Sequence, residues 1–244
     1  MENTRRSISP LVGLGIVLGL ALIISAGIGA YTLYQVRAFD NALAVTGSAK
    51  KSVTSDTVKW TSSITRSVKL SGLKAGYATL DQDLAQVKTF MKEQGIEDGQ
   101  IIVTPVFMNE VYQQYPQNEK EYTLQQNIEV QSTDVSKITM VAKNTSALIG
   151  KNILFATNGL EYYYSKLPEE RVALLAQAIV DAKARATEIA QSSGKKVGSL
   201  KSASSGVVQV LSKGSTDVSD YGAYDTSKVE KEIMVTVKAS FLLK

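Results

Sequence analysis

The sequence predicts an α+β protein in which an N-terminal transmembrane helix precedes a soluble body of two β-α-β-β units with antiparallel or mixed sheets. Residues 7–36 contain no charged side chain. Two later helical patterns end at glycines, and alternating apolar and polar residues follow each of them. We therefore expect a cytoplasmic stub and anchor over residues 1–37, the first unit over 38–133, a helical connector over 134–158 and the second unit over 159–244.

The N-terminal segment is long enough to cross a bilayer. The apolar stretch Leu11–Tyr34 exceeds the roughly 20 residues that a membrane-spanning helix needs. Arg5 and Arg6 precede it, which predicts a single-pass protein with a cytoplasmic N-terminus. The body is then expected outside the cytoplasm, in a bacterial periplasm. A cleaved signal peptide is the alternative, because the basic start, the apolar core and small residues near 25–30 fit one loosely.

A pair of small residues lies within this span. Gly15 and Gly19 form a G-x-x-x-G pattern, which allows two helices to approach closely in lipid. Glycine is also frequent in membrane spans in general, so the pattern alone leaves both interpretations open. We expect the lipid bilayer to be one partner of the protein, through this helix.

The first unit combines strand patterns with one amphipathic helix. Alternation over Val53–Leu70 is typical of a half-buried strand. The helix is expected over Leu73–Gln94 and ends at Gly95, which suits a left-handed cap. Its predicted apolar stripe consists of Tyr77, Leu80, Leu84, Val87 and Met91. The other expected strands are 43–52, 100–108 and 121–131.

The second unit repeats this order. A strand over Leu160–Lys166 precedes a helix over Pro168–Ser193, with Glu169 and Glu170 in its first turn and Gly194 at its end. The predicted buried stripe of this helix consists of Val172, Leu175, Ala176, Ile179, Ala182, Ala186 and Ile189. Further strands are expected over 197–211 and 233–243. The connector is expected to be helical, with Ile138, Val141 and Leu148 pointing inward.

The composition excludes several kinds of chemistry. The chain has no cysteine and no histidine, so disulfides, thiol nucleophiles, imidazole bases and most transition-metal sites are excluded. We assign the neighbouring carboxylates Asp81 and Asp83, like Glu169 and Glu170, to surface and helix-terminus positions. We therefore predict a protein that is not an enzyme and binds no cofactor. A buried lysine of depressed pKa beside a serine would reopen Ser–Lys catalysis.

The charge pattern gives no support to nucleic-acid binding. The 27 basic and 23 acidic residues leave a net charge of only +4, and the lysines are spread along the chain rather than clustered in a tract. No phosphate-binding glycine loop occurs. We expect no nucleic acid as a partner, and the sequence does not identify a small-molecule ligand.

Two tyrosine-bearing segments are the candidate contact sites. The long connector Ser212–Ser227 carries Tyr221, Tyr224 and Asp225, which are suited to contacting a partner or another subunit. Its carboxylates Asp217, Asp220 and Asp225 match no calcium-loop spacing, so we interpret it as a solvated loop without metal. The run Tyr162, Tyr163, Tyr164 places rings on both faces of a strand, for core packing on one face and subunit packing on the other, or for binding a ligand.

Several stretches together resemble the SIMPL-domain family, a bacterial envelope family of unknown function related to periplasmic immunogenic proteins. They are VTGSAKKSVTSD at Val45–Asp56, EQGIEDGQIIVTP at Glu93–Pro105, the long stretch Leu160–Val210 and YGAYDTSKVEKEIMVTVKASFLL at Tyr221–Leu243. The resemblance implies an α+β fold, export or anchoring to the inner membrane, and no established catalytic residues. It also implies links to oxidative-stress tolerance and large ring- or cage-like homo-oligomers, which some members form.

Two functions remain as hypotheses. The first is a non-enzymatic, membrane-anchored envelope protein that self-assembles into a ring or cage, with a role in envelope or oxidative-stress tolerance. The second is a monomeric periplasmic module that binds a ligand or a protein. The number of subunits and the physiological partner do not follow from the sequence.

Overall fold

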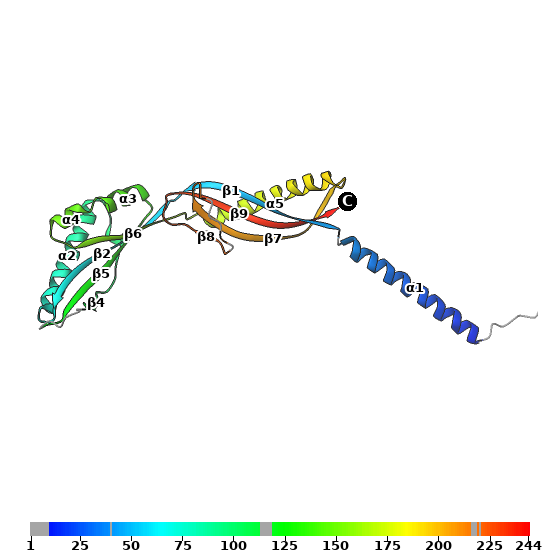
Figure 1. Cartoon of the computed structure of the whole chain (residues 1–244), viewed down its shortest axis with the longest axis horizontal. Helices are drawn as coiled ribbons and strands as arrows, with labels where there is room; N and C mark the ends of the chain where they lie inside the picture. Colours follow the sequence, from blue (N-terminus) through cyan, green and yellow to red (C-terminus); the bar gives the residue numbers. More distant parts are fainter. Residues whose placement is uncertain (1–9, 40, 113–118, 216–218, 220) are drawn as a thin grey trace, which may run out of the picture. The chain divides into compact units, whose positions relative to one another are not determined.

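We describe a computed structural model of the chain, which covers residues 10–39, 41–112, 119–215, 219 and 221–244. An N-terminal apolar helix precedes a body of mixed helices and strands (Figure 1), which confirms the predicted fold class. The chain divides into two compact units, and each is described separately. Unit 1 comprises Met1–Ser48, Ala178–Gly206 and Val237–Lys244, and unit 2 comprises Ala49–Gln177 and Val207–Thr236. The domain boundaries expected above stay predictions.

The N-terminal helix α1 spans Pro10–Phe39. Its stretch Leu11–Val36 is long and apolar enough to cross a membrane, and none of that stretch is buried against the protein. The length and composition also suit a signal sequence. Arg5 and Arg6, on which the predicted orientation depends, lie outside the described residues.

A five-stranded sheet forms the centre of unit 2. Its longest strand, β2 (Thr57–Lys69), pairs antiparallel with β5 (Glu121–Ser132) on one side and with β6 (Phe155–Tyr163) on the other. The expected strand over 100–108 is two short strands, β3 (Ile101–Val103) and β4 (Phe107–Glu110), which both pair with β5. Pro105 lies between them and has no backbone N–H to donate to a ladder.

Helices α2 (Leu73–Glu93), α3 (Val135–Lys143) and α4 (Ser146–Gly150) pack against this sheet. Short 3₁₀ turns at Leu70–Gly72 and Asp98–Gln100 flank α2 and β3. The buried core includes Trp60 and Ile64 from β2, Leu80, Val87 and Met91 from α2, and Ile138, Val141 and Leu148 from the connector. The inward positions predicted for the connector are therefore confirmed. Tyr77, predicted to be in the buried stripe of α2, is 38% exposed.

The second sheet has four strands in the order β1, β9, β7, β8. Their bounds are Ala42–Thr54 (β1), Glu230–Leu243 (β9), Val197–Ser212 (β7) and Ala223–Tyr224 (β8). Strand β8 pairs parallel with β7 and lies within the connector that was predicted to be a loop. Every second residue of β9 from Ile233 to Phe241 is buried, as the alternation predicted.

The strands are distributed over the two sheets in an order that the sequence did not indicate. Strand β1 precedes β2 directly in the chain but belongs to the four-stranded sheet, whereas β6, which begins the second repeat, pairs with β2. The chain therefore passes between sheets at residues 55–56, and again after β6. Both passages lie within unit 2.

In unit 1, strand β1 and the second half of α5 (Leu167–Ser192) approach each other very closely. A Cβ atom on Gly47 would lie 2.1 Å from the carbonyl oxygen of Ala178 and 2.7 Å from the Cβ of Ala182, so no side chain fits at position 47. The buried residues on this half of α5 are the alanines 178, 182, 186 and 190. Ile189, predicted to be buried, is 48% exposed, because the buried stripe is formed by these small residues instead.

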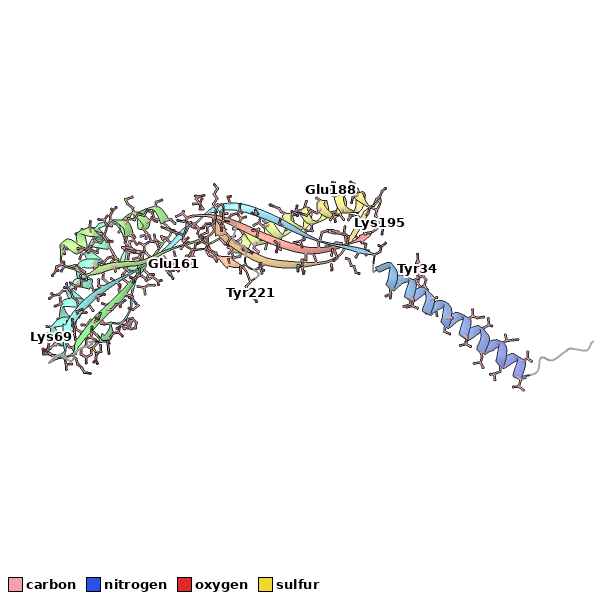
Figure 2. All side chains as sticks on the ribbon, viewed as in Figure 1. Tyr34, Lys69, Glu161, Glu188, Lys195 and Tyr221 are labelled. Carbon is pink, nitrogen blue, oxygen red and sulfur yellow. The ribbon has the colours of Figure 1, made fainter. Side chains whose placement is uncertain are left out.

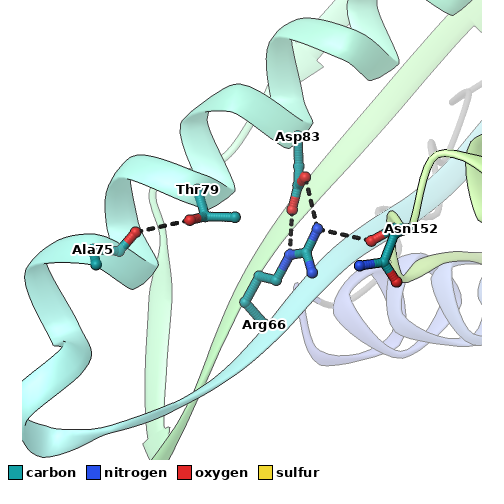
Figure 3. Close-up of polar contacts among 5 residues, drawn as sticks. All are labelled: Arg66, Ala75, Thr79, Asp83 and Asn152. Atoms are coloured by element: carbon teal, nitrogen blue, oxygen red, sulfur yellow. Dashed lines mark hydrogen bonds and ion pairs between the residues drawn. The ribbon is translucent and has the colours of Figure 1, made fainter.

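One acidic residue that we assigned to the surface is buried. Asp83 on α2 is 3% exposed, and its carboxylate accepts hydrogen bonds from Nε and Nη2 of Arg66 at 2.5 and 2.9 Å. Arg66 Nη2 also donates to the carbonyl oxygen of Asn152 at 2.8 Å (Figure 3). The surface assignment of Asp83 was wrong because β2 places a cation on the apolar face, and that cation needs a buried partner.

Removal of this buried carboxylate is expected to destabilise unit 2. In Asp83→Asn, the guanidinium of Arg66, whose side chain is only 20% exposed, loses its counter-charge, which should lower the free energy of unfolding by about 2–4 kcal/mol. Urea unfolding followed by fluorescence of Trp60, the only tryptophan, reports this change. The control is Glu110→Gln, because the pair between Lys120 and Glu110 is 62% and 49% exposed and should contribute less than about 0.5 kcal/mol. Equal effects of the two substitutions would contradict the assignment.

Candidate functional site

The structure brings the two predicted tyrosine segments together in unit 2. The rings of Tyr163 and Tyr224 lie 5.8 Å apart between centroids. The backbone N–H of Tyr164 donates to the hydroxyl of Tyr224 at 2.8 Å, and the N–H of Tyr162 donates to the carbonyl of Thr226 at 2.8 Å. The end of β6 is thereby joined to the segment that follows β8. We refer to Asp56, Tyr162–Ser165, Tyr224–Thr226 and Lys231 as the junction cluster.

Tyrosines 162 and 221, both predicted as contact residues, lie in opposite environments. Tyr162 is 6% exposed, belongs to the core of unit 2 and shares a hydrogen bond of 3.0 Å with the hydroxyl of Thr139. Tyr221 is 96% exposed (Figure 2) and does not join the cluster. Tyr163 and Tyr164 are half-buried.

Asp56, which the sequence did not single out, fixes the passage from β1 to β2. Its carboxylate accepts hydrogen bonds from the N–H of Ser165 at 2.8 Å and from the Ser165 hydroxyl at 2.7 Å. Its own N–H donates to the carbonyl of Tyr163 at 3.0 Å. Burial opposes ionisation of this carboxyl, but the hydrogen bonds from Ser165 outweigh it, so the pKa of Asp56 lies below its usual value. A serine one residue beyond the tyrosine run is the only sequence signal for this contact.

Lys231 is fully buried beneath Tyr224. Its ammonium donates to the carbonyl oxygens of Asp225 and, at 2.8 Å, of Lys228, and it lies 5.5 Å from the centroid of the Tyr224 ring. Burial lowers the pKa of Lys231, while the nearby carboxylate of Asp225 opposes this effect. The hydrogen bonds to two carbonyls and the ring face give the buried cation electrostatic partners.

Asp225 closes the turn between β8 and β9. Its carboxylate accepts hydrogen bonds from the hydroxyl of Ser212 and from the N–H of Ser227, the latter at 2.8 Å. These bonds lower the pKa of Asp225 to about 2. Asp217 and Asp220, the other carboxylates considered for calcium, lie outside the described residues. Within the described part of the chain, no group of three acidic residues is placed to hold a metal ion.

The cluster meets only part of the condition that would indicate Ser–Lys catalysis. Lys231 is a buried lysine with a depressed pKa, but the hydrogen bonds of its ammonium described above go to backbone carbonyls rather than to a serine hydroxyl. Ser55, next to Asp56, has a buried hydroxyl without a hydrogen-bond partner among the described residues. It is 4% exposed, so a substrate has no access to it in this conformation. The arrangement therefore suits holding the backbone in place.

Each unit also carries an open groove outside this cluster. In unit 2, an apolar groove of about 500 Å³ is lined by Leu167, Pro168, Arg171, Val172, Leu175 and Val208. Val172, predicted to be buried, is 69% exposed in it. In unit 1, a groove of about 420 Å³ lies beside the end of α5, and three lysines contribute to its walls. Neither groove was indicated by the sequence, because helix periodicity does not show which side of a stripe remains uncovered.

The fold defines an α+β body that follows an N-terminal apolar helix. Residues 43–241 match the model of the SIMPL family, described as a protein of unknown function (DUF541). Because the match covers most of the sequence, the chain belongs to this family, as its resemblance indicated. No curated protein matches the chain.

The low pKa of Asp225 predicts an acid-dependent contribution to stability. The ionised carboxylate stabilises the folded state above the ordinary pKa of 3.8, and this contribution is lost as the pH falls from about 4 towards about 2. Since the group is partly exposed, we expect a loss of about 1 kcal/mol over this interval that Asp225→Asn lacks. Urea unfolding of both proteins at several pH values, followed by Trp60 fluorescence, measures the difference. An Asp81→Asn control should keep the wild-type profile, and an unchanged profile in Asp225→Asn would refute the role of this carboxylate.

Proposed function

We propose that this SIMPL-family protein is a non-enzymatic, membrane-anchored protein of the bacterial envelope whose body self-assembles. The observation that carries the proposal is α1. At 1.5 Å per residue, the 26 residues of Leu11–Val36 extend about 39 Å, more than the roughly 30 Å of a hydrocarbon core. None of this stretch is buried against the protein, so lipid is the environment that suits its apolar side chains.

The orientation follows from charge. Two arginines precede the span, which favours a cytoplasmic N-terminus, a periplasmic body and an inner-membrane location. Cleavage of the segment as a signal peptide would instead release the body. A role in envelope or oxidative-stress tolerance enters the proposal through the family resemblance alone.

Exposed apolar and edge surfaces support self-assembly of the body. The apolar groove of unit 2 exposes Val172 beside Leu175 and Pro168. Strand β7 is 16 residues long, and in the described chain β8 pairs with it only at Gln209 and Val210. A long strand with an uncovered edge is suited to pairing with another chain.

The membrane helix offers a second surface for association. No atom lies within 4 Å of a Cβ built on Gly15 or Gly19, so this side of α1 is open to a second helix. The proposal thus has two sources of contact, one in the body and one in the membrane. They can be separated by removing α1.

The alternative is a monomeric binding module. Its support is the apolar groove, whose volume of about 500 Å³ falls in the usual range of ligand pockets. Among the residues that line this groove, Arg171 is the one cation. An apolar ligand with one anionic group would fit that chemistry. The oligomeric state distinguishes this alternative from the main proposal.

Light scattering of the detergent-solubilised full chain and of residues 38–244, side by side, tests the proposal. We expect both to show one defined mass several times that of the 26.3 kDa chain or of its shortened form. Val172→Glu should lower the mass of both forms, because it places a charge in the apolar groove. Thr89→Glu, at an exposed position of α2, is the matched control and should leave both masses unchanged. The full chain should also resist extraction of membranes by alkaline carbonate.

Other results contradict parts of the proposal. An oligomer only in the full chain would assign the contacts to α1. Monomers in both forms would refute self-assembly and favour the binding module, and release of the full chain by carbonate would refute anchoring.

A further inference from the structure

The charge of the body is distributed unequally between the two units. In the part of unit 1 that follows α1, residues 40–48, 178–206 and 237–244 contain seven lysines and arginines but only three carboxylates, Asp40, Asp181 and Glu188. Unit 2 contains 17 basic and 19 acidic residues. The excess of positive charge therefore belongs to the unit that also contains the membrane helix.

Three lysines of this unit line one groove. Lys183 lies on α5 in a row with Thr187 and Gln191, and Lys195 and Lys196 follow the end of that helix. All three lysines are exposed. In the described part of the chain, none of them forms an ion pair, whereas Asp181 is paired with Arg185 at 2.8 Å and also accepts from the N–H of Ser48. The groove thus combines three unneutralised ammonium groups with hydroxyl and amide groups.

The covalent chain places this groove close to the end of the span. Lys195 Nζ donates to the side-chain oxygen of Asn41 at 3.3 Å, and the carbonyl of Asn41 accepts from the N–H of Leu243 at 2.9 Å. Since α1 ends at Phe39, the Cα atoms of residues 39 and 41 are at most about 7 Å apart, whatever direction α1 takes. Residue 41 is therefore within about 12 Å of Val36, the last residue of the apolar span.

A distance of this size corresponds to the polar layer of a bilayer. Head groups extend roughly 5–8 Å beyond the hydrocarbon on each side, and charges act over a Debye length of about 8 Å at physiological salt. A lysine bonded to residue 41 thus lies within electrostatic reach of lipid phosphates. Basic residues at such a position attract anionic lipids, and each one raises the local preference for anionic over neutral lipid about fivefold.

We propose that Lys183, Lys195 and Lys196 form a binding surface for the head groups of anionic phospholipids in the leaflet from which the body emerges. This inference rests on the anchoring proposed above and adds to it a preference for lipid charge. The surface holds unit 1 against the membrane through phosphate contacts, while the near-neutral unit 2 has no comparable attraction. The three lysines together provide a preference on the order of a hundredfold over neutral lipid.

The test uses the full chain in vesicles. Because the sequence has no cysteine, Ser192→Cys provides a unique labelling position at the exposed end of α5 for a fluorophore. Two sets of phosphatidylcholine vesicles are compared. One contains a small fraction of anionic phosphatidylglycerol that carries a quencher, and the other contains phosphatidylcholine that carries the same quencher. We expect phosphatidylglycerol to quench at a mole fraction at least tenfold lower than phosphatidylcholine, and high salt to remove the difference.

Matched variants locate the effect. K183Q/K195Q/K196Q should make the two lipids quench equally. K74Q/K88Q/K92Q removes the same charge from exposed positions on α2 and should keep the wild-type preference. Provided that the chain floats with the vesicles, three results would overturn the inference. They are equal quenching by the two lipids in the wild type, an unchanged lipid preference in the first variant, and an equal loss of preference in both variants. A chain that fails to float with vesicles would overturn the anchoring itself, and with it this inference.

Discussion

The passage of the backbone between two sheets is the constraint on which the arrangement of unit 2 depends. Strands β1 and β2 are separated by only two residues, yet they belong to different sheets. Asp56 at this position accepts two hydrogen bonds from Ser165, which begins the passage from β6 to α5. A single carboxylate therefore fixes both passages, and hydrogen bonds of this charge-assisted kind are stronger than neutral ones.

Lys231 and its neighbours hold the turn before β9 against the same junction. The buried ammonium holds the carbonyls of Asp225 and Lys228, so the turn that leads into β9 keeps one conformation. The hydroxyl of Tyr224 accepts a hydrogen bond from the N–H of Tyr164, and its ring packs against the ring of Tyr163. Tyr163, Tyr164 and Tyr224 thus help to hold this junction together, whereas Tyr221 is exposed and lies outside it. The role of these tyrosines in subunit or partner contacts stays a prediction.

Much of the fold could be predicted because its signals are local. Apolar alternation located β2, β5 and β9, and the glycines at 95 and 194, with φ angles of +75° and +73°, correctly ended two helices. The exchange of β1 and β6 between sheets was missed, since strand pairing depends on contacts between distant residues that periodicity does not encode. The predicted buried stripe of α5 was wrong at Val172 and Ile189, which are exposed; where β1 approaches α5 at Gly47, the buried positions of the helix are the alanines 178 and 182.

The candidate sites show the same limit. Tyr162–Tyr164, Tyr224 and Asp225 were recognised from residue type. Asp56 and Lys231 were not, because a lone carboxylate between two strands gives no sign of its hydrogen-bond partners and a lone lysine in a strand gives no sign of its burial. The nearness of the lysine groove to the end of α1 depends on a hydrogen bond between Lys195 and Asn41, which are 154 positions apart in the chain. Such contacts become visible only when the fold is known.

Hydrogen exchange of the folded protein tests most directly whether the junction cluster is one cooperative unit. The amides of Asp56, Tyr162, Tyr164 and Ser165 donate the hydrogen bonds described above, and the neighbouring amide of Ser55 donates to the carbonyl of Val229 at 2.9 Å. We predict that they open with the same free energy as the amides of β2 in the core, and that Asp56→Asn accelerates their exchange before that of β2. Rapid exchange of these amides in the wild type, with β2 still protected, would contradict the account, because the junction would then open independently of the sheet.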